Sequence, residues 1–133
     1  MISKKILIKG KSFKGNQLGR KIGFPTINLL PPPNIILPKF GVYAAKTHLN
    51  NKVYRSIINI GIRPSINLGT EKIIVESHIF GEVEQDLYDI LISVELFHFI
   101  REEKKFDNLE ELKTQIAKDC SYVKTLFHSF YNL

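Results

Sequence analysis

Short runs of β-branched and aromatic residues, separated by Gly, Pro and Asn, fill the chain up to about Phe99. This rhythm is typical of an all-β barrel or sandwich, because each run is long enough for one strand and each interruption suits a turn. The predicted strands are residues 5–9, 26–30, 41–49, 53–60, 73–80 and 90–99. We expect 42–49 and 53–60 to form a hairpin, since Asn50 and Asn51 tolerate the positive φ of a two-residue turn. We also expect 73–80 and 90–99 to form an antiparallel pair, and 10–25 to be a long loop.

The pattern changes after Asp107 and Asn108. Apolar residues then recur at helical spacing with charged residues between them, at Leu109, Leu112, Ile116, Val123 and Phe127. This periodicity predicts an amphipathic helix over about 108–131, with Asp107 or Asn108 as its N-cap. We therefore predict a single domain over 1–133, with a mainly β barrel over about 1–100 followed by the C-terminal helix.

The composition limits which binding partners and which cellular compartment we expect for this protein. Nineteen Lys and Arg against thirteen Asp and Glu give a net charge of +6, which weakly favours anionic partners. The single cysteine, Cys120, allows neither an internal disulfide nor a cysteine metal cluster, and no segment is apolar enough to cross a bilayer. We expect a soluble, cytoplasmic protein that does not bind membranes.

The first segment with chemical potential is the glycine-bearing run that ends at Asn28. Glycines let backbone N–H groups approach phosphate oxygens, cations supply countercharge, and a hydroxyl suits a Mg²⁺ shell. The candidate ATP and phosphate ligands are Gly15, Gly19, Arg20, Lys21, Gly23, Phe24, Pro25, Thr26 and Asn28. The run matches neither the P-loop nor the dinucleotide fingerprint, so a surface loop with ordinary turn glycines is an equal alternative.

Thr26 and Asn28 have the same parity on an extended segment, so both side chains are expected on one face. There they form a candidate pair of Mg²⁺ ligands, or else a polar pair on a solvated strand face.

Glu76 and His78 likewise share one face of their strand. A carboxylate beside a bound alcohol accepts its proton as oxygen attacks phosphorus, although a strand glutamate commonly pairs with a nearby lysine instead. His78 is interpreted as structural.

Two further clusters are less informative by themselves. Residues 59–64 are interpreted as a strand end followed by a tight loop, and residues 101–106 as a charged run before the helix. Phe106 and Tyr88 are candidates to cover a flat aromatic ligand, but packing is the first interpretation for both.

Taken in order, these segments resemble the riboflavin kinase family, including the kinase module of bacterial bifunctional FAD synthetases. The resemblance covers nearly the whole chain. Its motifs are Gly-Arg-x-x-Gly-Phe-Pro-Thr-x-Asn at 19–28, Gly-Val-Tyr-Ala at 41–44, Asn-x-Gly-x-Arg-Pro at 59–64, Glu-x-His at 76–78 and Arg-x-Glu-x-Lys-Phe at 101–106. The chain departs from the family pattern at Ile27, Ser65 and Asp89.

The resemblance implies a six-stranded antiparallel Greek-key β-barrel with a C-terminal α-helix. It also implies phosphorylation of the ribityl 5'-hydroxyl of riboflavin by ATP with Mg²⁺, giving FMN and ADP. In that family Thr26 and Asn28 correspond to the residues at Mg²⁺ and the ATP phosphates, and Glu76 to the catalytic base. The flavin-binding candidates by position are Arg101, Glu103 and Phe106.

Two rival functions remain open from the sequence. One is a barrel that binds single-stranded RNA, although the basic residues concentrate in loops and termini rather than beside aromatic residues on strands. The other is a flavin-binding module without catalysis. We expect riboflavin and ATP as partners, no nucleic acid, and either a monomer or a module joined to an upstream FAD synthetase domain.

Overall fold

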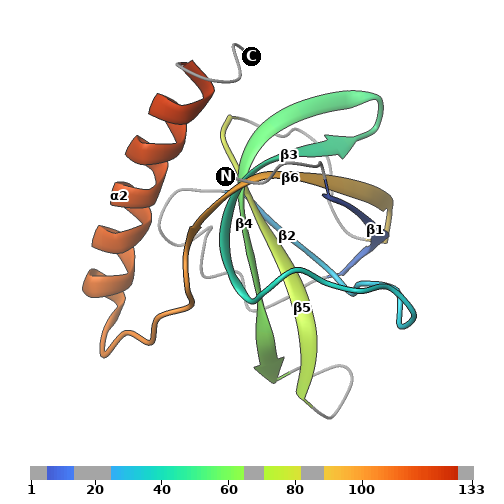
Figure 1. Cartoon of the computed structure of the whole chain (residues 1–133), viewed down its shortest axis with the longest axis horizontal. Helices are drawn as coiled ribbons and strands as arrows, with labels where there is room; N and C mark the ends of the chain where they lie inside the picture. Colours follow the sequence, from blue (N-terminus) through green and yellow to red (C-terminus); the bar gives the residue numbers. More distant parts are fainter. Residues whose placement is uncertain (1–5, 14–24, 65–70, 82–88, 129–133) are drawn as a thin grey trace.

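The computed structural model describes residues 6–13, 25–64, 71–81 and 89–128. Within these ranges the elements are β1 (Ile6–Phe13), β2 (Thr26–Leu29), β3 (Gly41–Leu49), β4 (Lys52–Pro64), β5 (Glu71–Ile79), β6 (Leu91–Arg101) and α2 (Leu109–Leu126). The strands form a closed antiparallel barrel in the order β1-β2-β5-β4-β3-β6, and α2 stands beside it (Figure 1). The predicted mainly β barrel with a C-terminal helix is confirmed.

The strand order is that of a Greek key. β3, β4 and β5 are neighbours in sequence and in space, and β6 returns to pair with β3 on its other side. The predicted pairing of 73–80 with 90–99 is therefore wrong. β5 pairs with β2 and β4, whereas β6 pairs with β1 and β3, because a Greek-key return separates strands that local sequence makes look like a hairpin.

The hairpin between β3 and β4 is confirmed. Asn50 and Asn51 have φ values of 49° and 65°, and β3 pairs with β4 along its full length. Positive φ at both central residues gives the turn a twist that matches the strands it joins. Asp89 also has a positive φ of 65°, so the aspartate that departs from the family pattern occupies a position that favours glycine.

Four strands, β1, β4, β5 and β6, extend beyond the predicted bounds, β1 and β4 furthest. β1 continues through Gly10 to Phe13, and at Gly10 a Cβ would lie 2.7 Å from the backbone oxygen of Leu30. The glycine thus permits close approach of two chain segments instead of starting a loop. β4 continues through Gly61 to Pro64 and pairs there with β5, so the predicted loop at 61–64 is wrong.

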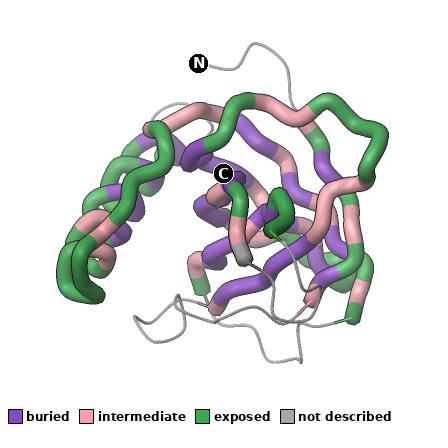
Figure 2. The backbone as a smooth tube through the Cα atoms, turned by 90° about the horizontal axis from the view of Figure 1, so that it is seen from below, coloured by how far each residue is buried: buried purple, intermediate pink, exposed green. Residues whose placement is uncertain are grey.

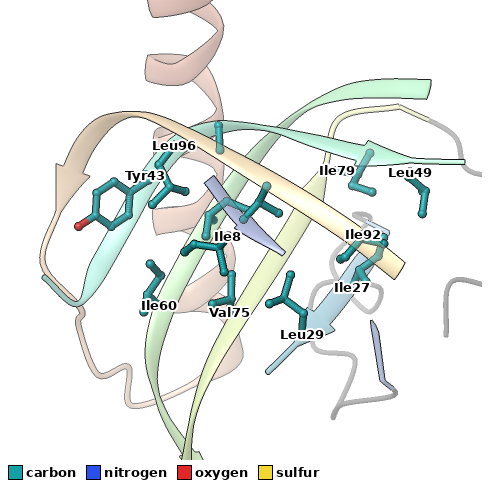
Figure 3. Close-up of a cluster of buried hydrophobic side chains, with 13 residues drawn as sticks. Ile8, Ile27, Leu29, Tyr43, Leu49, Ile60, Val75, Ile79, Ile92 and Leu96 are labelled. Carbon is teal, nitrogen blue, oxygen red and sulfur yellow. The ribbon is translucent and has the colours of Figure 1, made fainter. Parts of the chain in front are cut away.

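The barrel interior is one hydrophobic core. Isoleucine, leucine and valine side chains from all six strands meet there with Tyr43, as Figure 3 shows for ten labelled residues. Three hydroxyls are also fully buried inside: Thr47 Oγ1 lies 2.8 Å from Ser56 Oγ and 2.7 Å from Ser77 Oγ. Their mutual hydrogen bonds remove the penalty of burying them.

A second core joins the outside of the barrel to the helix. Ile116, Val123 and Phe127 of the predicted helical stripe are buried against the barrel, as the buried colour on one side of the helix in Figure 2 illustrates. Leu112 packs partly against this core, and Leu109 is 46% exposed. Asn108 is the N-cap, because its side-chain oxygen accepts the Glu111 N–H at 2.9 Å. The helix ends at Leu126, and the predicted positions 129–131 lie outside the described residues.

Candidate functional site

A cavity of about 350 Å³ lies where the outer face of the barrel meets the helix and the segment leading into it. The barrel contributes Val42, Ile57, Asn59, Arg63, Glu76 and His78. Arg101, at the end of β6, also belongs to the barrel. The opposite wall consists of Lys104, Phe106 and Asn108 before the helix, and Leu109, Leu112, Ile116 and Asp119 on it. Both walls therefore carry ionisable groups, and the helix-side wall adds an aromatic ring and aliphatic side chains.

Glu76 points out of the barrel into this cavity. Its neighbours Val75 and Ser77 are buried in the interior, so strand alternation directs Glu76 to the outer face. Its side chain is 15% exposed, and its Oε1 accepts a hydrogen bond from Arg63 Nε at 3.0 Å. Glu76 is thus a largely buried carboxylate paired with arginine, rather than a solvated glutamate paired with lysine.

The predicted hydroxyl and amide lie on the strand next to Glu76. In the register of β2 with β5, Asn28 is opposite Glu76 and Thr26 is opposite His78. Ile27 and Leu29 belong to the barrel core, so Thr26 and Asn28 face outward, as strand parity predicts. The sequence-predicted residues near 26 and at 76 are therefore brought together on one face, although Thr26 and Asn28 do not line the cavity itself.

His78 is buried beneath this face. Its Nδ1 lies 3.1 Å from the Thr26 hydroxyl oxygen. Burial lowers the pKa of His78, since desolvation outweighs the attraction of Glu76 and Asp119 for its charged form. A neutral imidazole that orients the Thr26 hydroxyl fits the structural interpretation of His78.

Most of the predicted phosphate loop lies outside the described residues. Gly15, Gly19, Arg20, Lys21, Gly23 and Phe24 lie outside the described residues, as does Tyr88. Pro25 is described, and its backbone oxygen accepts the Ile79 N–H at 2.9 Å. This bond fixes the start of β2 against the end of β5.

The flavin-binding candidates have three different surroundings. Arg101 makes three hydrogen bonds of 2.8–3.1 Å to the carboxylate of Asp119, which is 4% exposed. Glu103 accepts a 2.7 Å hydrogen bond from Arg63 Nη2 and does not line the cavity. Phe106 lines the cavity, with Lys104 Nζ 5.9 Å from its ring centroid. Of the three, Phe106 presents the surface best suited to a flat ring.

Sequence reasoning missed several residues of the site. The sequence pattern predicts a strand end and loop at Asn59 and Arg63, yet both line the cavity from β4. The signal was present as alternation: Ile57, Asn59 and Arg63 share one parity, opposite to the core residues between them. Asp119 gave no such signal, because a charged residue in an amphipathic helix is ordinarily read as solvated.

The site offers oxygen ligands but no ready-made metal cluster. Among the described residues, no group of three His, Cys, Asp or Glu side chains is placed to hold a metal ion. The side-chain oxygen of Asn59 is buried and makes no hydrogen bond to any residue that the structure describes. A hard cation here would depend on Thr26, Asn28 and the oxygens of a bound ligand, which is the manner in which Mg²⁺ is commonly held.

This geometry defines a β-barrel with a helix-covered ligand cavity whose walls hold a buried acid and an aromatic ring. The riboflavin kinase model, Flavokinase, matches residues 2–127, and the chain belongs to that family. A bifunctional riboflavin kinase/FMN adenylyltransferase of Haemophilus influenzae is 38% identical over 97% of this chain and 41% of its own length. The chain spans about two fifths of the length of this relative and of the bifunctional relative from Bacillus subtilis.

Solved structures share the fold. Riboflavin kinase from Trypanosoma brucei has a TM-score of 0.67 at 18% identity, covering 96% of this chain and 82% of that one. A Streptococcus pneumoniae protein described as a macrolide-efflux protein has a TM-score of 0.76 at 29% identity, covering 89% of this chain and 38% of that one. Among the described residues, no helix combines the length and apolarity that a membrane crossing requires.

Proposed function

We propose that this chain is a riboflavin kinase domain that transfers the γ-phosphoryl group of ATP to the ribityl 5'-hydroxyl of riboflavin. Membership of the family supports the reaction, and one observation supports its location. Glu76, the acid of the predicted motif, lies in a helix-covered cavity on the same barrel face as Thr26 and Asn28. The kinase reaction needs a carboxylate that accepts the hydroxyl proton next to the ligands of the ATP phosphates, and this arrangement supplies both.

The proposed chemistry uses Glu76 as general base. The ribityl oxygen forms a bond to the γ-phosphorus, the bond from that phosphorus to the bridging oxygen of ADP breaks, and the hydroxyl proton passes to Glu76. Glu76 Oε1 is held by Arg63, whereas Oε2 makes no hydrogen bond in the described part of the chain. This second oxygen is the one that would accept the proton.

The Thr26 hydroxyl and the Asn28 amide oxygen would hold Mg²⁺ together with ATP phosphates and water. The bound ion would neutralise the negative charge that develops on the transferred phosphoryl group. The same two side chains occupy the barrel face beside Glu76, and a neutral His78 orients the first of them. Gly15, Gly19, Arg20, Lys21, Gly23, Phe24 and Pro25 remain the predicted ligands of the ATP phosphates.

The flavin ring would occupy the wall opposite Glu76. Phe106 and the aliphatic side chains of Leu109, Leu112 and Ile116 line that wall and suit a flat, largely apolar ring. Arg101 and Glu103, predicted from the motif, are proposed to shape this wall through their ion pairs with Asp119 and Arg63 rather than to contact the ring.

The rival functions are not favoured. The family to which the chain belongs is named for riboflavin kinase activity, which neither rival function includes. We further propose that the domain works in the cytoplasm, either alone as a monomer or beside an FMN adenylyltransferase module such as those named in its relatives.

Product analysis tests the proposal. Protein incubated with riboflavin, ATP and Mg²⁺ should form FMN and ADP in equal amounts, measured by chromatography with flavin fluorescence. Glu76→Gln should still bind riboflavin but lose about a hundredfold or more in kcat, because it cannot accept the proton. Lys118→Ala, on the exposed side of α2, is the matched control. Near-normal turnover by Glu76→Gln would reject this residue as the base, and absence of FMN with the unaltered protein would reject the function.

A further inference from the structure

Arg63 is shared between two carboxylates of different origin. Its Nε donates to Glu76 Oε1 at 3.0 Å, and its Nη2 donates to Glu103 Oε1 at 2.7 Å. Glu76 belongs to the barrel wall, whereas Glu103 belongs to the segment that carries Phe106 and leads into α2. One guanidinium therefore connects the candidate base with the candidate flavin wall.

This arrangement is partly shielded from water. The side chains of Arg63, Glu76 and Glu103 are 28%, 15% and 31% exposed. Burial lowers the pKa of Arg63, but the hydrogen bond to Glu103 and the charges of Glu76 and Glu103 more than offset this and raise it. Arg63 thus stays charged, and its two ion pairs are stronger than those of a fully solvated pair.

Gly61 makes the arrangement possible. It lies on the same face of β4 as Asn59 and Arg63, and a Cβ at this position would lie 2.2–2.4 Å from the Glu103 carboxylate. Any larger residue would push that carboxylate away from Arg63. The absence of a side chain at 61 therefore leaves room for the Glu103 carboxylate beside Arg63.

We propose that Arg63 is a positioning residue, which holds one oxygen of Glu76 so that the other faces the acceptor hydroxyl. Glu103 in turn holds Arg63 in place, and the absence of a side chain at Gly61 leaves room for the Glu103 carboxylate. The inference rests on the proposed function, in which Glu76 is the base. It adds that the orientation of the base depends on the docking of the flavin wall. Besides Arg63, the charged or titratable groups around Glu76 in the cavity are His78, Arg101, Lys104 and Asp119.

The test is a kinetic cycle with riboflavin and MgATP. Arg63→Met should lower kcat about tenfold to a hundredfold with little change in the KM for MgATP, because the phosphate ligands are untouched. Gly61→Ala and Glu103→Gln should lower kcat by smaller factors. In a Glu76→Gln background, Arg63→Met should have almost no further effect, because residues that act as a unit are not additive. Arg55→Met, on the same strand outside the cavity, is the control and should match the unaltered protein.

The outcomes separate this inference from the function on which it rests. If the unaltered protein makes no FMN, the proposed function fails and the inference fails with it. If FMN forms but folded Arg63→Met keeps full kcat, the inference alone is overturned. An equal loss from Arg63→Met with and without Glu76 would also overturn it, since Arg63 would then act independently of the base. Arg63→Gln replaces Arg63→Met in each comparison if thermal unfolding shows that the methionine variant does not fold.

Discussion

His78 illustrates how burial decides the role of a single residue. Strand parity places Glu76 and His78 on the same face, and both line the cavity. Glu76 Oε2 makes no hydrogen bond to another described residue. His78 is 9% exposed and bonded to Thr26. The sequence therefore predicted the face correctly, and the depth of each residue decided which one suits proton transfer.

The lowered pKa of His78 predicts a pH-dependent stability. Above its ordinary value of 6.5 both folded and unfolded chains hold the ring neutral. As the pH falls below that value, the unfolded chain takes up the proton more readily, so the free energy of unfolding should decrease. His78→Asn should flatten this dependence, measured by urea unfolding at several pH values. His98, whose pKa burial also lowers, should leave a smaller slope in the same direction. An unchanged slope in His78→Asn would contradict the assignment.

At the scale of elements, one buried ion pair fixes the helix to the barrel. Arg101 ends β6, and Asp119 lies in the middle of α2, where Gln115 also donates to it at 3.0 Å. The planar guanidinium group of Arg101 donates hydrogen bonds to both oxygens of the Asp119 carboxylate, which sets the position of α2 along β6. The cavity exists because this pair and the second core hold the helix at that position.

Removing the buried partner should be costly. Asp119→Ala leaves Arg101, 21% exposed at its side chain, without its carboxylate, so the free energy of unfolding should fall by about 3 kcal/mol. Lys118→Ala, one residue away on the exposed side, should change it by less than about 0.5 kcal/mol. Denaturant unfolding of the two variants measures the difference. Equal losses would show that the pair does not anchor the helix.

For the whole molecule, the two cores create the site between them. The barrel core closes the strands on themselves, and the second core covers part of the outer surface with α2. Cys120 lies in the second core at 6% exposure, and burial raises its pKa to about 11. It is thus a natural reporter of whether the helix is docked.

Thiol labelling should therefore be slow in the folded protein. Ionisation alone should make Cys120 about a hundredfold less reactive toward iodoacetamide than an ordinary thiol near pH 8, since the thiolate is the reactive form. Labelling should accelerate in denaturant. Riboflavin bound between barrel and helix should slow it further. Native labelling as fast as that of the unfolded chain would mean that α2 is not held against the barrel.

The sequence by itself determined the local structure and the strand face on which each of the key side chains lies. Alternation placed Thr26 and Asn28 on one face and Glu76 and His78 on one face, Asn50 and Asn51 set the hairpin turn, and helical spacing located α2. These properties depend on residues close together in the chain, whose periodicity reports directly on burial. The ordered motifs also predicted the family.

Only the tertiary structure decided which strands are neighbours and which charges meet. The Greek-key return that separates β5 from β6, the bridge from Glu76 through Arg63 to Glu103, and the burial of Asp119 all depend on distant register. Local periodicity says which side of a strand or helix is buried, but not what it is buried against. Gly61 shows the physical reason, because its role is defined by a carboxylate 42 positions further along the chain.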